Sequence, residues 1–290
     1  MTFSDPESRA AGPVAFLDSG VGGLPYLAAA RCLLPDERYV YLADRAGFPY
    51  GRKTPAEVRA CAMAAVRALV RATAPKALVV ACNTATELAI DAIREAHPDL
   101  PVIGTVPAIK PAAALSAAKR IAVLATPGAA AAPYLLDLAR RWAPDCAVER
   151  IGDGDLVDFV ENRLVAADAA GRLAAIRPAL DAALASGADV IVLGCTHFIH
   201  LKSDFAAAAG PSVRVIDSVD GVVAQLRRVL ERGPGLAAQR TGAPDARGAE
   251  GDTRGAEGDT MYLTGDGEFG SPYTEFADRF GLVPAGALAT

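Results

Sequence analysis

Long apolar runs and basic runs are both missing from this chain of 290 residues. No stretch approaches the roughly 20 apolar residues that would span a bilayer, and residues 1–13 carry no apolar core of a signal peptide. The 29 Lys and Arg residues are outnumbered by 34 Asp and Glu and nowhere cluster, which gives a net charge of −5. These absences argue against a membrane and against nucleic acid as partners, and we expect a cytoplasmic protein.

Cysteine and histidine are scarce, with five and three residues, and no C-x-x-C pair occurs. An odd number of scattered cysteines makes disulfides unexpected, and because metal-ligand spacing is absent we expect no metal site. Cys32 and Cys61 lie within helical patterns, and we expect both to be buried as small hydrophobes. His97 precedes Pro98 at the end of a helical pattern and is expected to be solvent-exposed.

Apolar residues make up 52% of the chain and many of them are alanine, which predicts a globular protein with many closely packed helices. Short apolar runs alternate with the helical stretches, and this alternation predicts an α/β fold of mostly parallel sheets flanked by helices. Strands are expected at Val14–Asp18, Tyr39–Leu42, Ala77–Cys82, Val102–Thr105, Ile121–Ala125, Ala147–Ile151, Asp189–Gly194 and Val213–Ile216. Helices are expected at Leu24–Leu33, Pro55–Ala72, Thr86–Ala96, Pro133–Arg141, Leu173–Ala185 and Val219–Glu231.

A weak internal repeat runs through this order. Phe16–Ser19 and Val123–Thr126 each end a strand at a turn that contains Gly or Pro, and Cys82 and Cys195 then follow at nearly the same offset. This correspondence predicts two pseudo-symmetric lobes with the active site in the cleft between them. The expected boundaries place residues 12–106 and 213–290 in the first lobe and residues 107–212 in the second.

Residues 241–260 differ in composition from the rest of the chain. They contain the string Arg-Gly-Ala-Glu-Gly-Asp-Thr twice in tandem, at 247–253 and at 254–260. A repeat so rich in glycine and charge cannot bury a face, which predicts a flexible surface insertion. The apolar residues that follow, Met261–Thr264, are expected to return the chain to the edge of a sheet.

Two of the expected strands end in a cysteine. The string Val-Val-Ala-Cys-Asn-Thr at 79–84 and the string Val-Leu-Gly-Cys-Thr-His at 192–197 each carry an apolar run into a thiol. α/β proteins bind ligands at the carboxyl ends of such strands, where the N-terminus of the next helix favours a thiolate. A single strand-end cysteine is more often structural than catalytic, but two in matched contexts favour catalysis. Two thiols facing one substrate suit the transfer of a proton off one face of a carbon and onto the other.

The remaining polar candidates gather around these strand ends. Asp18 and Ser19 begin a glycine-rich turn, in which Asp18 would repel a phosphate and instead suits a proton acceptor, while Ser19 suits a substrate carboxylate. His197 follows Cys195 closely and suits an acid/base partner. For Pro49–Gly51 two interpretations stay open, a plain loop turn and a turn at the site. Compact donors and acceptors suited to orienting a small polar ligand are Asn83, Thr84 and Thr196.

Five segments together carry a family resemblance: residues 16–24, Asp44 with residues 49–51, residues 81–85, residues 104–111 and residues 194–198. In order and spacing they resemble the glutamate racemases of the cofactor-independent aspartate/glutamate racemase superfamily, over about residues 13 to 230. The resemblance implies two α/β lobes with the active site between them. It also implies interconversion of L- and D-glutamate, with D-glutamate supplied to peptidoglycan synthesis, no cofactor, and a homodimer.

The resemblance further implies roles for particular residues. Cys82 and Cys195 match the family's two acid/base thiols, and Asp18 and His197 match the polar residues that assist them. Glu161 aligns with the family's auxiliary acid, although the cysteine that often precedes that segment is absent here. The residues expected to contact the substrate are Asp18, Ser19, Tyr50, Gly51, Asn83, Thr84, Thr196 and His197.

Two alternatives stay open. The first is a racemase of aspartate or of another amino acid in the same superfamily, although the strings at 18–23 and 49–51 favour glutamate. The second is a non-catalytic metabolite-binding α/β protein built on the same sheets, in which both thiols would be dispensable.

Overall fold

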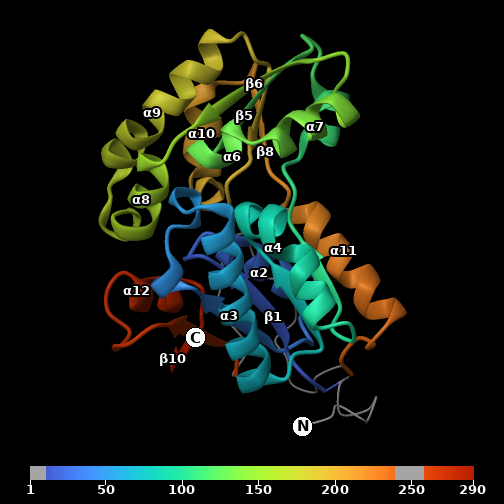
Figure 1. Cartoon of the computed structure of the whole chain (residues 1–290). Helices are drawn as coiled ribbons and strands as arrows, with labels where there is room; N and C mark the ends of the chain where they lie inside the picture. Colours follow the sequence, from blue (N-terminus) through green and yellow to red (C-terminus); the bar gives the residue numbers. More distant parts are fainter. Residues whose placement is uncertain (1–10, 239–257) are drawn as a thin grey trace. The chain divides into compact units, whose positions relative to one another are not determined.

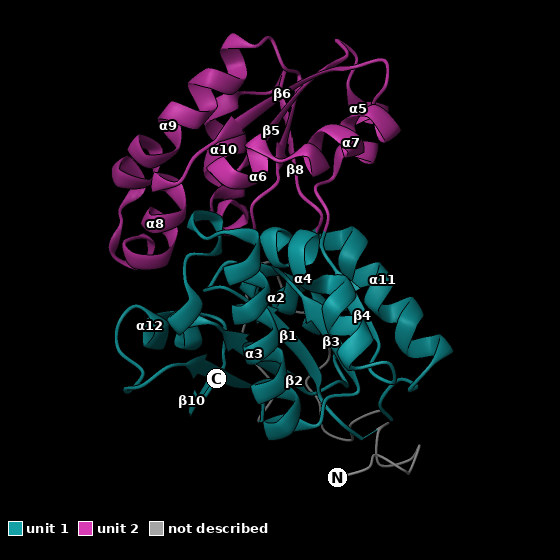
Figure 2. Cartoon of the chain, viewed as in Figure 1, with its two compact units in different colours: residues 1–105, 219–290 teal, residues 106–218 magenta. Residues whose placement is uncertain are grey.

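The computed structural model describes residues 11–238 and 258–290, and the chain divides into two compact units. Unit 1 comprises residues 1–105 and 219–290 and unit 2 comprises residues 106–218, drawn in teal and magenta in Figure 2. Each unit is a parallel β-sheet flanked by helices, as the alternation in the sequence predicts. Among the described residues, no helix is both long enough and apolar enough to cross a membrane.

Unit 1 holds a six-stranded sheet in the order β10-β9-β2-β1-β3-β4, in which all neighbouring strands run parallel. The strands β1 to β3 are buried along their whole length, which is why they appear in the sequence as continuous apolar runs. The six strands are β1 (Val14–Asp18), β2 (Tyr39–Ala43), β3 (Ala77–Val80), β4 (Val102–Gly104), β9 (Thr260–Thr264) and β10 (Val283–Leu288).

The helices of unit 1 pack on this sheet (Figure 1). Helix α3 begins at Pro55 after a capping box, in which the Thr54 hydroxyl and the Glu57 carboxylate each accept a hydrogen bond from the other residue's backbone N–H. α3 and α4 pack together over the face that Leu17 and Val80 present, while α2 packs against α11. The helices are α2 (Leu24–Leu33), α3 (Pro55–Thr73), α4 (Asn83–Ala96), α11 (Val219–Arg232), α12 (Tyr273–Arg279) and the short η1 (Arg45–Gly47) and η2 (Tyr50–Arg52).

Unit 2 holds a four-stranded parallel sheet in the order β6-β5-β7-β8. This order repeats the β2-β1-β3-β4 order of unit 1, so the weak sequence repeat corresponds to a repeated topology. Strand β8 belongs to unit 2 through its pairing with β7, whereas the boundaries drawn from the sequence place residue 213 onward in the first lobe. The strands are β5 (Arg120–Ala125), β6 (Ala147–Gly152), β7 (Val190–Leu193) and β8 (Arg214–Ile216). The helices are α5 (Ile109–Leu115), α6 (Pro127–Ala131), α7 (Pro133–Trp142), α8 (Asp155–Asn162), η3 (Leu164–Ala166), α9 (Ala169–Ala185), η4 (Thr196–Leu201) and α10 (Lys202–Ala209).

The end of the predicted insertion is part of the sheet. Residues 241–257 of that insertion lie outside the described residues, but the last residues of the second repeat lead directly into β9. Asp259 is buried, and its carboxylate accepts hydrogen bonds from Arg31 Nε at 3.0 Å and from Tyr39 N at 2.9 Å. The prediction of a flexible loop up to residue 260 is therefore wrong for these last residues, because a tertiary ion pair holds them.

Two further differences concern short elements. β9 pairs with β2 on one side and with β10 on the other, so β10, and not the returning residues 261–264, forms the edge of the sheet. β10 carries a proline and a glycine and is exposed at most positions, so it lacks the apolar run by which a strand is recognised in the sequence. The unpredicted helices α5, α6, α8, α10 and α12 have five to eight residues each, too few to establish an apolar period.

Candidate active site

The glycine-rich turn after β1 is built around a buried carboxylate. Asp18 ends β1 fully buried, and its Oδ1 accepts hydrogen bonds from Ser19 Oγ at 3.0 Å and from Gly20 N at 3.2 Å. The hydroxyl of Tyr41, in β2, donates to Gly20 O at 2.8 Å and accepts from Gly23 N at 3.0 Å. Tyr41 thus holds both ends of the turn. Its role has no signal in the sequence, where it is one more apolar residue of a buried strand.

Cys82 follows the carboxyl end of β3, and β3 pairs with β1, the strand that leads into this turn. Cys82 is the N-cap of α4 with an extended backbone (φ −139°, ψ 120°), and only 5% of the residue is exposed. Gly23 packs against the residue before it, since a Cβ on Gly23 would stand 2.8 Å from the Ala81 Cβ. The unpaired N–H groups and the dipole of a helix N-terminus favour the thiolate form of a cysteine in this position.

The first residue of α4 offers an unsatisfied amide. The Oδ1 and Nδ2 atoms of Asn83 are both buried, and neither has a hydrogen-bond partner in the described part of the chain. A buried amide without partners costs free energy, so such groups in native proteins usually meet a ligand or an ordered water. The neighbouring Thr84 is half-buried in the same first turn. Asn83 therefore offers a polar group at the carboxyl end of the sheet that a small ligand can satisfy.

The Tyr50 turn is held by a second buried carboxylate. Tyr50 donates its hydroxyl hydrogen bond to Asp44 Oδ2 at 2.6 Å, and Asp44 Oδ1 accepts from Thr264 Oγ1 at 2.5 Å and from Gly47 N at 3.3 Å. Burial, and then the Asp44 carboxylate, raise the pKa of Tyr50 above its ordinary value, so the phenol stays protonated. The Tyr50 hydroxyl therefore stabilises this turn. Gly51, the next residue in η2, is half-buried. Thr264 belongs to β9, and sequence reasoning missed it.

Unit 2 presents a thiol in the same backbone setting. Cys195 follows β7 as the N-cap of η4, with an extended backbone (φ −120°, ψ 135°) and 6% exposure. A Cβ on the preceding Gly194 would stand 3.0 Å from the Leu124 carbonyl oxygen, so the chain passes close to β5 here. β7 lies next to β5 just as β3 lies next to β1, so each thiol follows the equivalent strand of its sheet.

A buried histidine that follows the second thiol by two residues pairs with a buried glutamate from another helix. His197 Nε2 lies 2.9 Å from Glu161 Oε2, and the two side chains are 3% and 1% exposed. Glu161 comes from α8, which packs against the η4 segment that carries Thr196 and His197. The contact fixes the orientation of the imidazole. Thr196, between the thiol and the histidine, is also buried.

The predicted site residues thus form two groups, one at the carboxyl end of each sheet. The group in unit 1 consists of Asp18, Ser19, Tyr50, Gly51, Cys82, Asn83 and Thr84. The group in unit 2 consists of Glu161, Cys195, Thr196 and His197. Across residues 11–238 and 258–290, His, Cys, Asp and Glu side chains nowhere gather into a group of three or more that could hold a metal ion.

Comparison with known proteins assigns the chain to a family. Residues 26–226 match the model of the Asp/Glu/Hydantoin racemase family. The chain belongs to this family. A glutamate racemase of Shewanella sp. (strain MR-7) is 40% identical over 220 residues, which are 75% of this chain and 79% of that protein. A glutamate racemase of Deinococcus radiodurans is 40% identical over 242 residues, which are 82% of each chain.

Solved structures of glutamate racemases share the fold of this racemase family member. The Escherichia coli enzyme, in complex with L-glutamate and the activator UDP-MurNAc-Ala, superposes with a TM-score of 0.76 and 32% identity, over 96% of this chain and 98% of that one. The RacE1 isoform of Bacillus anthracis superposes with a TM-score of 0.71 and 26% identity, over 95% and 97% of the two chains. The predicted fold class and the predicted family are both confirmed.

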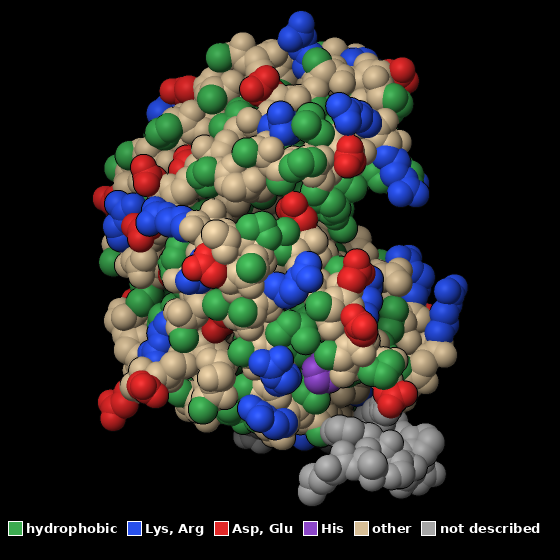
Figure 3. All heavy atoms as spheres, viewed as in Figure 1, with side chains coloured by type: hydrophobic (Ala, Val, Ile, Leu, Met, Phe, Trp, Pro, Cys, Tyr) green, Lys and Arg blue, Asp and Glu red, His purple; other side chains and the backbone are tan. Residues whose placement is uncertain are grey.

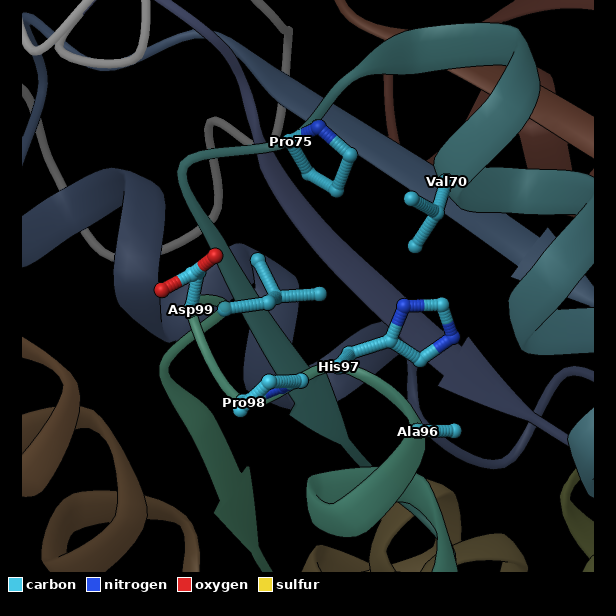
Figure 4. Close-up of a pocket in the computed structure, with 7 residues that line it drawn as sticks. Val70, Pro75, Ala96, His97, Pro98 and Asp99 are labelled. Carbon is cyan, nitrogen blue, oxygen red and sulfur yellow. The ribbon is translucent and has the colours of Figure 1, made fainter. Parts of the chain in front are cut away.

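His97 lies away from both groups. It caps the C-terminal end of α4 and is half-buried, not exposed as predicted, because it lines a cavity of about 170 Å³ with Val70 and Pro75 (Figure 4). Burial, and then Arg67, lower the pKa of His97. Pro75 and His97 precede β3 and β4 in the chain, so this cavity lies at the end of the strands opposite to Cys82.

The two cysteines expected in the core differ from that expectation. Cys32 is exposed, because it falls on the outer side of α2, whose buried residues include Leu24 and Leu27. Cys61 is half-buried, and burial followed by the charge of Asp44 raises the pKa of its thiol. Neither cysteine stands at a strand end, so neither shares the setting of the two candidate catalytic thiols.

Proposed function

We propose that this protein interconverts L- and D-glutamate without a cofactor, with Cys82 and Cys195 as its two acid/base groups. The observation that carries the proposal is the matched pair of buried thiols, each the N-cap residue after the equivalent strand of its sheet. The family match supports racemisation, and relatives named glutamate racemase at 40% identity support glutamate as the substrate. The similar Escherichia coli enzyme was crystallised with L-glutamate, in agreement with this choice.

The proposed reaction is a proton exchange at the α-carbon. One cysteine thiolate takes the α-proton, the electron pair stays on carbon, and the S–H of the other cysteine protonates the opposite face. The first cysteine ends as a thiol and the second as a thiolate, so the product enantiomer is bound to the state that catalyses the reverse reaction. The proposal requires each unit to contribute one thiol to the same substrate molecule.

The neighbouring polar groups receive supporting roles in this proposal. Asp18 accepts the thiol proton of Cys82 or returns it. His197, which Glu161 orients, does the same for Cys195. Because the α-proton is very weakly acidic, fixed donors must stabilise the carbanion, and the unsatisfied amide of Asn83 suits that task. Substrate contacts are proposed for Ser19, Tyr50, Gly51, Thr84 and Thr196.

The test is a cofactor-free racemisation assay. Purified protein should abolish the optical rotation of either glutamate enantiomer, and should leave aspartate almost unchanged. Cys82→Ser and Cys195→Ser should each lower the rate by about a thousandfold or more, while Cys32→Ser, which changes an exposed cysteine, should leave it unaltered. Full activity in both serine variants would overturn the two-thiol mechanism. Faster turnover of aspartate than of glutamate would instead make the chain an aspartate racemase.

The cellular setting belongs to the same proposal. We infer that the product D-glutamate enters peptidoglycan synthesis in the cytoplasm, as the resemblance to glutamate racemases implies. Cells depleted of this protein should then lyse unless D-glutamate is supplied, and growth that is indifferent to depletion would contradict this role. The homodimer also stays a prediction.

A further inference from the structure

Thr86 holds the short turn that carries Cys82 from both sides. Between the end of β3 at Val80 and the start of α4 at Asn83, this turn consists of Ala81 and Cys82 alone. The Thr86 hydroxyl donates a hydrogen bond to Val80 O at 3.1 Å, and the Thr86 backbone N–H donates one to Cys82 O at 2.9 Å. One residue thus fixes the first and the last peptide group of the turn, and with them the direction in which the Cys82 side chain leaves the backbone.

This support compensates for a weak helix cap. Ser, Thr, Asp and Asn are the usual N-cap residues, because their side-chain oxygen accepts a hydrogen bond from the first turn of the helix. The sulfur of a cysteine is only a weak acceptor, so the N-cap residue Cys82 cannot fix the turn in that way. Thr86 supplies the constraint through the backbone and not through the reactive sulfur.

A third hydrogen bond directs the Thr86 hydroxyl. Its oxygen accepts from Thr105 N at 3.1 Å, and the Thr105 hydroxyl pairs with the Tyr26 hydroxyl at 3.0 Å. Because a backbone N–H can only donate, the proton of the Thr86 hydroxyl is directed to Val80 O. Charged side chains of both signs are scattered over the face of the molecule in Figure 3, whereas Tyr26, Thr86 and Thr105 are all buried. Water therefore competes little for these hydrogen bonds.

Packing fixes the methyl group of Thr86 as well. A Cβ on Gly104, in β4, would stand 2.6 Å from Thr86 Cγ2 and 3.2 Å from Thr86 Oγ1, so this side chain lies directly on the Gly104 backbone. Only one staggered rotamer of Thr86 places the methyl group and the hydroxyl in these positions together. Both branches of the threonine are thus in use, and valine would lose the hydrogen bonds while serine would lose the methyl contact.

The equivalent position in unit 2 carries a different side chain. Four residues after Cys195 stands Ile199, which is buried and has no hydroxyl. Cys195 O accepts instead from Phe198 N at 3.1 Å, in the tighter 3₁₀ turn of η4. Of the two strand-end thiols, it is therefore Cys82 that a hydroxyl four residues further on supports, and the two thiols should respond differently when that hydroxyl is removed.

We propose that Thr86 is a positioning residue for catalysis, which holds the Cys82 thiol in its reactive direction by gripping the backbone on both sides of it. The inference rests on the proposed function, in which Cys82 is one of the two acid/base groups. Proton transfer depends on the distance and alignment of the reacting atoms, and a displacement of about 1 Å can lower a rate by about a hundredfold. Thr86→Val should therefore lower kcat by about ten- to a hundredfold and change KM much less.

Alkylation of the thiols tests this role without any measurement of racemisation. The folded full chain is treated with iodoacetamide over a range of pH, and mass spectrometry follows the modification of Cys82 and of Cys195 in their separate peptides. In Thr86→Val the midpoint of the Cys82 profile should move to higher pH, because the thiol loses its fixed place at the helix N-terminus that favours the thiolate. The Cys195 profile should stay as in the wild type, and it is the control within each sample.

Three further variants complete the test. Thr86→Ser keeps the hydroxyl and should retain most of kcat and the wild-type Cys82 profile. Thr86→Ala removes the hydroxyl without pressing a methyl group against its backbone partners, and should show the same changes as Thr86→Val, so the test does not depend on the folding of one variant. Thr73→Val is the matched control, because the Thr73 hydroxyl donates a similar hydrogen bond to Leu69 O at 2.8 Å in α3. It should leave kcat and both alkylation profiles unaltered.

A Cys82 profile that stays in place in Thr86→Val and Thr86→Ala, or wild-type kcat in both, would overturn the proposal. Equal shifts of the Cys82 and Cys195 profiles would also overturn it, as would losses in Thr73→Val as large as in Thr86→Val, since either result would mean a general loosening of the fold. If the Cys82 profile moves as expected in a protein that does not racemise glutamate, the support of the thiol by Thr86 stands and only the proposed function is lost.

Discussion

His197 Nε2 lies 2.9 Å from Glu161 Oε2, and the two residues are buried together although 36 positions separate them in the chain. In the proposed reaction this carboxylate orients the imidazole that serves Cys195. Glu161→Gln keeps the size and the hydrogen bond but removes the charge, and should lower kcat by about a hundredfold. The acid limb of the pH–rate profile should also move, because an imidazolium without its carboxylate loses its proton at lower pH.

The matched control for this variant lies one turn away on the same helix. Asp158→Asn changes a carboxylate on α8 that is 49% exposed, and should leave both kcat and the pH profile unaltered. Equal losses in Glu161→Gln and Asp158→Asn would mean that α8 tolerates no change, and the assigned role of Glu161 would be lost. Glu161→Asp should retain part of the activity, since it keeps the negative charge but holds it farther from the imidazole.

Thr264 is expected to matter although it lies far from the site motifs in the sequence. Its hydroxyl donates to Asp44 and accepts from Ala46 N at 3.0 Å, so it supports the turn that holds Tyr50. Thr264→Val keeps the shape, leaves the buried Asp44 short of a donor, and should destabilise the protein by about 1–3 kcal/mol. Thr264→Ser retains the hydroxyl and should unfold like the wild type in urea. A valine variant as stable as the serine variant would exclude this supporting role.

The two identical repeats allow a matched test of the β9 anchor. Asp259 pairs with Arg31 and with the backbone of Tyr39, while Asp252 occupies the same place in the first copy of the repeat. Asp259→Asn breaks a buried ion pair and should lower the unfolding free energy by about 3 kcal/mol. Asp252→Asn should have no effect on thermal unfolding, and deletion of residues 247–253 should be equally harmless. Equal effects of the two substitutions would contradict the assigned anchor.

Tyr50 makes the stability of the fold sensitive to alkaline pH. Its pKa is raised in the folded state, chiefly by burial and then by Asp44, whereas an unfolded tyrosine ionises near pH 10. Below that pH the two states bind the same proton. As the pH rises past about 10 the unfolded state loses its proton first, so stability falls. Between about pH 8 and 11, the free energy of unfolding measured in urea should fall less steeply with pH in Tyr50→Phe than in Tyr134→Phe. Tyr134 is the control because it is partly exposed.

The features that sequence predicts well here are local. Each thiol follows an apolar run and precedes Asn or Thr. This pattern arises in adjacent residues because a buried parallel strand leads directly into the helix after it. The Asp18 turn is equally local. Only the family resemblance points to Glu161, since α8 by itself shows an ordinary amphipathic helix.

The features that sequence misses are tertiary. Thr264 meets Asp44 across 220 positions, and Asp259 meets Tyr39 across the same separation, so neither contact has a short-range signature. Tyr41 is indistinguishable in the sequence from a core tyrosine, although its hydroxyl holds the glycine-rich turn. Cys32 is expected in the core but is exposed. A helical pattern does not reveal which of its residues face outward when many of them are alanine.

The recurrence of one strand order in both sheets has a kinetic consequence. Cys82 is held by β3 and α4 and Cys195 by β7 and η4, so a substitution in one unit perturbs one thiol. Free L- and D-glutamate are mirror images with equal free energies, and the ratio of kcat/KM in the two directions is therefore fixed at unity. A lesion in either unit must lower both values of kcat/KM equally. Which of the two thiols a lesion affects can be seen only when kcat and KM are compared separately for the two directions. It can also be seen from exchange of the α-proton for deuterium without inversion of the α-carbon.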